Sequence, residues 1–110
     1  MNIYDTANLL ANEIKKSEEY YNYKMAKESI NLNNELKEKI KKFEMVRYDV
    51  QLSAMQNGKN DEEKYKKMQD LYVELIEYPE AKSYFEAETK FNIVIADINK
   101  IIGDAIKDLM

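Results

Sequence analysis

The sequence predicts an all-α protein, a bundle of about five helices that ends in a long C-terminal helix. Only 2 glycines and 1 proline occur among 110 residues, too few turn residues for a β-sandwich, a barrel or a doubly wound sheet. Apolar residues recur at steps of three and four, which is the period of helices that pack along one face. Glutamate also precedes lysine by four residues repeatedly, an orientation that stabilises a solvated helix face. These pairs are Glu35/Lys39, Glu38/Lys42, Glu62/Lys66, Glu63/Lys67 and Glu86/Lys90.

Two short helices are predicted at the N-terminus. The first begins at Asn2 or Asp5 and ends near Lys16. Ser17 is a favourable N-cap residue because its hydroxyl can accept a backbone N–H, and two glutamates follow it in the first turn. The second helix therefore covers residues 18 to about 30.

A cluster of asparagines separates the second helix from a long third helix. Asn31, Asn33 and Asn34 favour a break, because their short amides compete for backbone hydrogen bonds. The third helix is predicted over residues 34 to about 56, and its apolar stripe should pack on another helix. This second packing seam consists of Leu36, Ile40, Phe43, Arg47 and Val50.

One clear loop interrupts the chain, the segment Asn57-Gly58-Lys59-Asn60. Asn60 and Glu63 have the spacing of a capping box, so they should begin a fourth helix. We expect that helix to end at about residue 77.

The final helix is predicted from Pro79 nearly to Leu109, since proline suits a first helical position. It would be roughly 45 Å long at about 1.5 Å per residue. A compact chain of this size has a radius of gyration of only about 13 Å, so the helix would project and expose isoleucines. A second copy is the simplest cover, and we expect an intertwined or side-by-side homodimer, or a higher oligomer. The predicted interface residues are Phe91, Val94, Ile95, Ile98, Ile101, Ile102 and Ala105.

Two alternatives stay open in this helix. Gly103 can mark a break that returns the helix into a monomeric bundle, or it can allow close approach of another helix. Glu88 alone interrupts the apolar stripe. Its carboxylate either pairs with Arg47, a lysine or a tyrosine across an interface, or lies at the edge of the seam in water.

The composition argues against enzymatic chemistry. The chain has no histidine and no cysteine, so it lacks the usual general base, thiol nucleophile and soft metal ligands. Its two glycines cannot build a phosphate-binding loop or a dinucleotide fingerprint. We expect no catalytic residue, no metal site and no cofactor.

Lysines form the best candidate surface for nucleic acid. They cluster at residues 37–42 and 64–67, but most have a glutamate partner, and Arg47 is the only arginine. With a net charge of -4, a solvated helix face is the better interpretation. Direct RNA binding through these lysines is kept as the alternative function.

The sequence also indicates a location. Its first ten residues lack the basic segment and apolar core of a signal peptide. The most apolar stretch, residues 91–102, is short and contains polar residues, so it does not predict a membrane span. We therefore expect a cytoplasmic protein.

Four segments form a recognisable pattern, and the resemblance that they support covers nearly the whole chain. They are Tyr4-Asp5-Thr6-Ala7-Asn8-Leu9-Leu10, Ser17-Glu18-Glu19-Tyr20, Glu86-Ala87-Glu88 and Ile98-Asn99-Lys100-Ile101-Ile102. Together they resemble the YlbF/YmcA family, particularly its shorter YheA-type members. The resemblance implies an all-helical, dimer-forming cytoplasmic protein of bacteria. Some relatives act in a complex that influences ribonuclease-dependent mRNA processing, competence, sporulation and biofilm formation, and they carry cysteines associated with iron–sulfur clusters. This chain has no cysteine.

These observations predict a single helical domain over residues 1–110 that acts without catalysis. It would be a protein-interaction module, with a regulatory or adaptor role of the kind that the resemblance implies. Its expected partners are a second copy of itself and an unidentified cytoplasmic protein.

Overall fold

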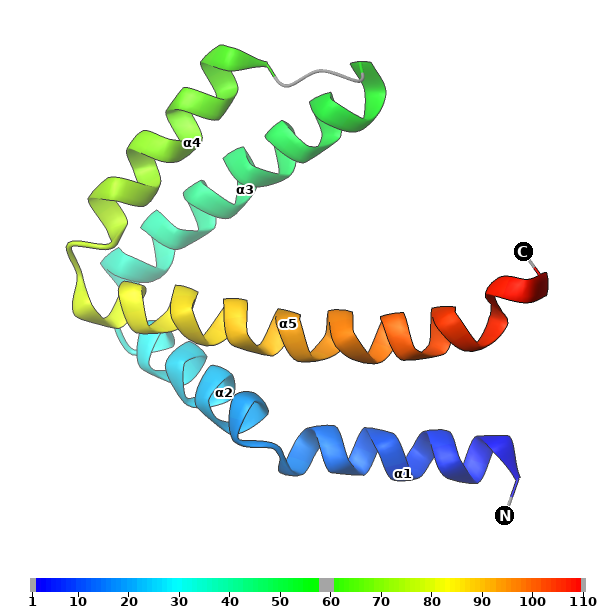
Figure 1. The fold of residues 1–110 in the computed structure, drawn as a ribbon. Coiled ribbons are helices and arrows are strands. Elements are labelled where there is room, and N and C mark those ends of the chain that lie inside the picture. The colour runs from blue at the N-terminus through cyan, green and yellow to red at the C-terminus, as the bar shows by residue number, and fades with distance from the viewer. Residues whose placement is uncertain (1, 58–60, 110) are drawn as a thin grey trace. The chain divides into compact units, whose positions relative to one another are not determined.

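A computed structural model describes residues 2–57 and 61–109 of the chain. The helices are α1 (Ile3–Lys16), α2 (Glu18–Asn31), α3 (Asn34–Asn57), α4 (Glu62–Leu75) and α5 (Pro79–Ile106), followed by a 3₁₀ turn over Lys107–Leu109 (Figure 1). No strand occurs in these two stretches. The all-α prediction is confirmed, and so is the long C-terminal helix.

Short polar side chains set the first helix boundaries. Asn2 and Asp5 form a capping box, in which the Asn2 side chain accepts the Asp5 N–H at 2.9 Å. Ser17 ends α1 with an extended backbone, and its N–H donates to the Ile14 carbonyl at 3.1 Å. The Ser17 hydroxyl then accepts the Tyr20 N–H at 3.2 Å, which caps α2. One residue therefore separates two helices.

The start of α4 differs from the predicted one. Asp61 is the N-cap, and its carboxylate accepts the N–H groups of Glu63 and Lys64 at 3.1 and 3.2 Å. An aspartate adds charge to this cap, which favours the positive end of the helix dipole. Of the predicted loop, Asn57 ends α3, whereas residues 58–60, including the predicted cap Asn60, lie outside the described residues.

The two later boundaries also test the predictions. Helix α4 ends at Leu75, two residues before the predicted position, because the chain turns ahead of Pro79. Helix α5 continues through Gly103 to Ile106. The break considered at Gly103 is therefore wrong, and a β-carbon there would meet nothing within 4 Å.

The chain divides into two compact units, and the divisions fall within α2 and α5. We call Met1–Lys27 with Tyr84–Met110 the terminal unit, and Glu28–Ser83 the central unit. The single domain over residues 1–110 stays a prediction.

The central unit is built on the packing of α3 against α4. The two helices run side by side in Figure 1. Leu36 and Leu75 are 1% and 2% exposed, and burying such a side chain fully stabilises a fold by about 1.5–3 kcal/mol. The rings of Phe43 and Tyr72 lie 5.9 Å apart between the helices. This unit has a closed apolar core of its own.

The terminal unit is held together differently, by aromatic rings between α2 and α5. The ring centroids of Tyr20 and Phe91 lie 6.0 Å apart, edge to face. Tyr23 lies 5.7 Å from Phe91 and 5.7 Å from Tyr84. Aromatic pairs in such arrangements add about 0.5–1.5 kcal/mol beyond the area that they bury.

Candidate interaction surfaces

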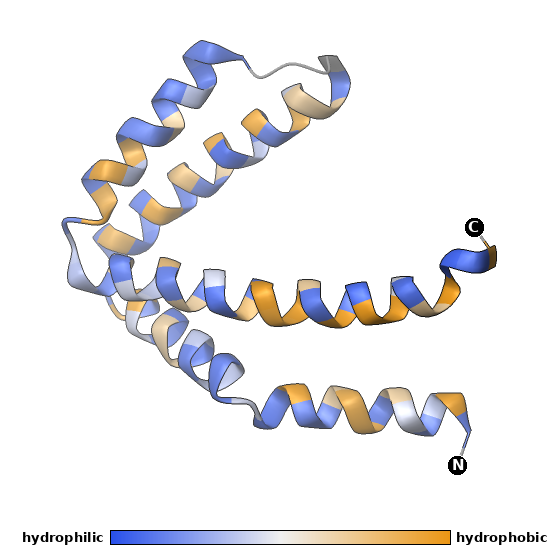
Figure 2. Cartoon of the chain, in the orientation of Figure 1, coloured by the Kyte–Doolittle hydropathy of each residue, from blue (hydrophilic) through white to orange (hydrophobic). Residues whose placement is uncertain are grey.

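The predicted dimer interface lies on the part of α5 that belongs to the terminal unit, where hydrophobic residues recur along the helix (Figure 2). Its first members are partly covered within the chain, and its last members are not. Ile101 is 69% exposed and Ile102 is 50% exposed. The partly covered residues are Phe91, Val94, Ile95 and Ile98, and Ala105 is exposed.

Helix α1 carries an apolar stripe that the sequence analysis did not single out. Ile3, Ala7, Leu10 and Ile14 follow one another at steps of four, three and four. None of the residues of α1 is buried, although its hydrophobic side chains concentrate on one face. Its apolar spacing was the signal that could have revealed this surface from the sequence.

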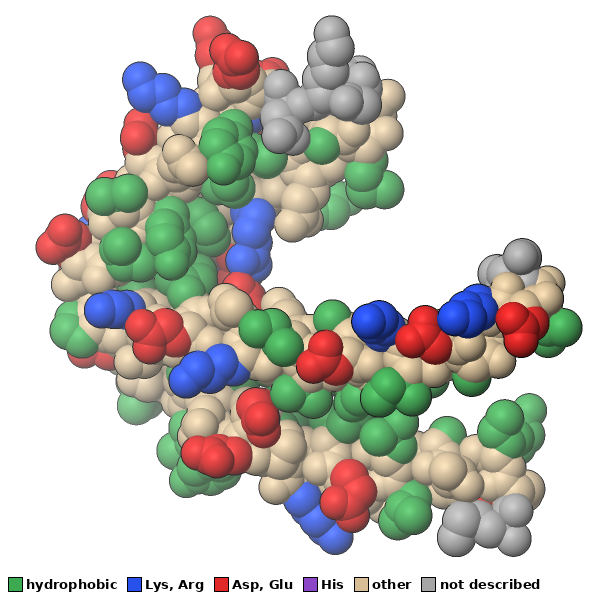
Figure 3. Space-filling view, viewed as in Figure 1, with side chains coloured by type: hydrophobic (Ala, Val, Ile, Leu, Met, Phe, Trp, Pro, Cys, Tyr) green, Lys and Arg blue, Asp and Glu red, His purple; other side chains and the backbone are tan. Residues whose placement is uncertain are grey.

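Both helices thus leave apolar side chains open to water in the terminal unit. Figure 3 shows hydrophobic side chains gathered along the sides of α5 and α1 that face each other. Ile3 is 77% exposed, and Ile102 and Ile106 are 50% and 44% exposed. Contiguous apolar surface of this kind is typical of a contact site, because monomeric proteins rarely leave it open.

Glu88 has a partner within its own unit. The Tyr23 hydroxyl of the same chain donates to the Glu88 carboxylate at 3.3 Å. The pair links α2 to α5 beside the aromatic rings. The pairing considered for Glu88 across an interface stays a prediction.

The second packing seam lies between α3 and α4. Four of its members are buried, namely Leu36, Ile40, Phe43 and Val50. Arg47, the remaining one, is partly exposed, and its guanidinium carbon lies 5.4 Å from the centre of the Phe43 ring. An arginine fits this seam because its planar head stacks on an aromatic face.

Lys39, one of the lysines of α3, is engaged in contacts inside the central unit. The Lys39 ammonium donates to the Tyr78 hydroxyl at 2.8 Å and lies 3.5 Å from Glu35 and 3.8 Å from Glu74. The hydrogen bond to Tyr78 is the main cause that raises the pKa of Lys39 above its ordinary 10.5. An ammonium group with these partners has fewer N–H groups available to bind phosphate.

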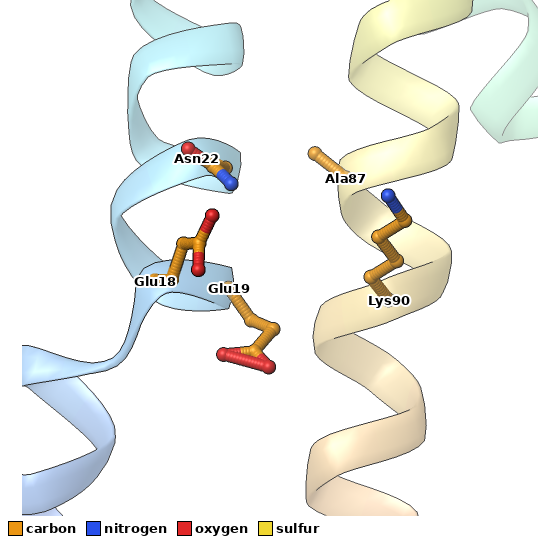
Figure 4. A pocket seen from close by; sticks show the side chains of 5 residues that line it. All are labelled: Glu18, Glu19, Asn22, Ala87 and Lys90. Atoms are coloured by element: carbon orange, nitrogen blue, oxygen red, sulfur yellow. The ribbon is translucent and has the colours of Figure 1, made fainter.

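A small pocket lies between α2 and α5 (Figure 4). Its volume is about 190 Å³, and Glu18, Glu19 and Asn22 of α2 line it opposite Ala87 and Lys90 of α5. Small-molecule sites usually measure about 300–1,000 Å³, so this pocket is below their range. Lys90 brings a positive charge to the wall opposite the two glutamates, which disfavours a bound cation.

Within the described stretches of the chain, no three acidic, histidine or cysteine side chains come together in a way that could hold a metal ion. In the same part of the chain, no helix has the length and hydropathy needed to cross a bilayer.

Comparison with known proteins places these helices in a family. The family model described as "Control of competence regulator ComK, YlbF/YmcA" matches residues 3–107. The chain belongs to the YlbF/YmcA family. It is 34% identical to a UPF0342 protein of Desulfitobacterium hafniense over 110 residues, 100% of this chain and 89% of that protein. A UPF0342 protein of Caldicellulosiruptor bescii is 32% identical over 96% of this chain and 89% of its own length. One from Clostridium novyi is 32% identical over 98% of this chain and 95% of its own length.

Membership in the YlbF/YmcA family agrees with the resemblance drawn from the four sequence segments. The match spans all five helices, and it therefore includes parts of both chain segments of the terminal unit. The family is associated with regulation, as its description states.

Proposed function

We propose that this protein is a non-catalytic regulatory or adaptor module that acts through protein contacts in the cytoplasm. The exposed apolar surface of α1 and α5 is the observation that carries the proposal. Leaving apolar surface in water costs about 25 cal/mol per Å², so a partner that covers it gains affinity. Membership in a family associated with regulation supports the same role.

The first partner is a second copy of the chain. A homodimer, intertwined or side by side, would cover the α5 residues around Ile98 together with the stripe of α1. A two-fold contact uses the same surface on both copies, which suits helices that are apolar along their length. The missing histidines and cysteines support a role without catalysis.

The second partner is another cytoplasmic protein, and co-purification tests for it. The full chain, tagged and expressed in its own organism, should retain a protein partner after the lysate is treated with nuclease. Direct RNA binding would give a different result, since retention would depend on intact RNA and fall steeply with salt. Loss of every partner after nuclease treatment would contradict the proposal.

A further inference from the structure

Helix α3 carries a second apolar stripe on the side away from α4. Its four members are spaced by three, four and three residues, which aligns them along one face. Tyr48 follows the buried Phe43 by five residues, and at about 100° per residue this places it across the helix from the α4 contact. The exposed fractions are 70% for Met45, 63% for Tyr48, 36% for Leu52 and 83% for Met55. We call these four residues the outer stripe.

The core of the central unit does not need the outer stripe. Buried side chains on the opposite side of α3 already make the contact with α4. Methionine and tyrosine are also residues that adapt well to a binding partner, since methionine is flexible and tyrosine has an apolar ring with a polar tip. The exposed stripe is therefore surplus to the packing of this hairpin.

The charges beside the outer stripe are mainly acidic. A shallow hollow of about 530 Å³ is lined by Met45 and Tyr48 together with Lys41, Glu44 and Asp49. The one arginine of this stretch lies over the Phe43 ring, on the α4 side of the helix. A partner that fits this surface therefore carries basic residues opposite the two carboxylates, with an acidic residue favoured towards Lys41.

The size of the outer stripe decides between a second copy and a short segment. From Met45 to Met55 it spans about 15 Å at about 1.5 Å per residue. A stable dimer buries about 800 Å² per partner, whereas even an aromatic side chain buries only about 150–250 Å². Four partly exposed side chains fall short of that area. They match about three turns of one amphipathic helix.

We infer that the outer stripe is the docking site for a short amphipathic helix of another protein, with apolar residues at steps of three and four and lysine or arginine beside them. The inference rests on the proposed function and specifies the surface and the partner. The partner helix would lie along α3 in the way that helices bind apolar grooves.

Two synthetic peptides test the docking site on the purified full chain. Both have about 18 residues, enough to form a helix, and the same leucine stripe, but one is flanked by lysine and arginine and the other by glutamate. At about 0.15 M ionic strength, we expect saturable binding of the basic peptide, and binding of the acidic peptide at least about tenfold weaker. Equal affinity for the two peptides would overturn the inference.

Matched variants locate the binding. The double variant Met45→Gln and Met55→Gln should weaken the basic peptide at least about tenfold, because glutamine keeps helix propensity and removes the apolar contact. Val73→Gln is the control, since Val73 is 58% exposed on α4. It should leave the affinity unchanged. Unchanged affinity in the double variant would show that the peptide binds elsewhere.

Thermal unfolding and co-purification complete the test. The double variant should keep the wild-type Tm, and a clear decrease would mean that this chain or a second copy already covers the stripe. A native partner that co-purifies equally with the double variant would leave the proposed function standing and refute this docking site. Specific binding of the basic peptide with no native partner would refute the proposed function instead.

Discussion

Lys39 shows how one side chain links two segments of the central unit. Its ammonium reaches Glu35 on its own helix, Glu74 near the end of α4, and Tyr78, which lies 39 residues along the chain. The ammonium also lies 5.0 Å from the centre of the Tyr78 ring. The hydrogen bond to Tyr78 and the electrostatic interactions with Tyr78, Glu35 and Glu74 favour the charged lysine more than desolvation disfavours it, which is why its pKa is raised.

Replacing Tyr78 with phenylalanine should lower the pKa of Lys39, because the main cause of the increase is the hydrogen bond to the tyrosine hydroxyl. A raised pKa in the folded state means that these contacts stabilise the fold fully below about pH 10.5 and lose that effect as the pH rises through the raised value. An NMR titration of the lysine side chain measures the change. Tyr65→Phe is the control, since the Tyr65 hydroxyl accepts a hydrogen bond from Gln69 instead. Identical Lys39 titrations in wild type and Tyr78→Phe would contradict the assignment.

Asp61 is a second residue with a measurable role. Asp61→Ala should destabilise the protein by about 1 kcal/mol, the typical cost of losing an N-cap side chain. Denaturant unfolding measures this difference. Asp70→Ala, at an exposed position inside α4, should cause no comparable loss because alanine is the better helix former there. If Asp61→Ala and Asp70→Ala are equally stable, the Asp61 cap does not stabilise α4 as proposed.

At the scale of elements, α1 and α3 differ in how their apolar faces are covered. Both have apolar faces, but α3 buries one of them against α4, whereas α1 buries no residue. Isolated helices as short as α1 are marginal in water, even with a capping box. Its stability should therefore depend on a partner that covers its apolar stripe.

Leu10→Asp tests this dependence, because it places a carboxylate in the stripe of α1. If a second copy covers the stripe, the variant should dissociate while its central unit stays folded. Analytical ultracentrifugation and far-UV circular dichroism measure the two effects. Asn12→Asp adds the same charge on the other side of the helix and should keep the wild-type mass. A Leu10→Asp variant that sediments as wild type would exclude α1 from the interface.

At the scale of the whole molecule, the two units differ in how completely each buries its own apolar side chains. The central unit encloses leucines, isoleucine and phenylalanine between two helices. The terminal unit relies on aromatic contacts between α2 and α5 and leaves several isoleucines open to water. This difference is the basis of two of our proposals, that the terminal unit carries the self-association and that the outer stripe of the central unit binds another protein.

Ile98→Asp tests the proposed dimer. Ile98 lies in the middle of the predicted interface, and a buried carboxylate without a partner costs about 3–5 kcal/mol, an effect that a two-fold contact suffers twice. The variant should run as a monomer or unfold in size exclusion with light scattering. Asn99→Asp, at an exposed neighbouring position, and Lys42→Ala should leave the mass unchanged. A wild-type chain with a mass of 13.1 kDa at micromolar concentration would refute the dimer.

The sequence by itself determined the helices, because their signals are local. Caps such as Asn2 and Ser17, the proline at the start of α5 and apolar steps of three and four act within one or two turns. Boundaries were less predictable where two candidate caps stand next to each other, as at Asn60 and Asp61. The seam of α3 was also readable, since its periodicity requires a packing partner without naming it.

Only the tertiary structure decided which surfaces pair. Tyr23 and Glu88 are 65 residues apart, and no local pattern relates them, because their contact depends on how α2 and α5 pack. The tertiary structure also decided that α4 is the helix that packs on the α3 seam. The outer stripe of α3 is exposed because the opposite face of the helix makes the contact with α4. Helix periodicity specifies that a face is apolar, whereas its cover depends on contacts between distant segments, and these decide which faces remain for partners.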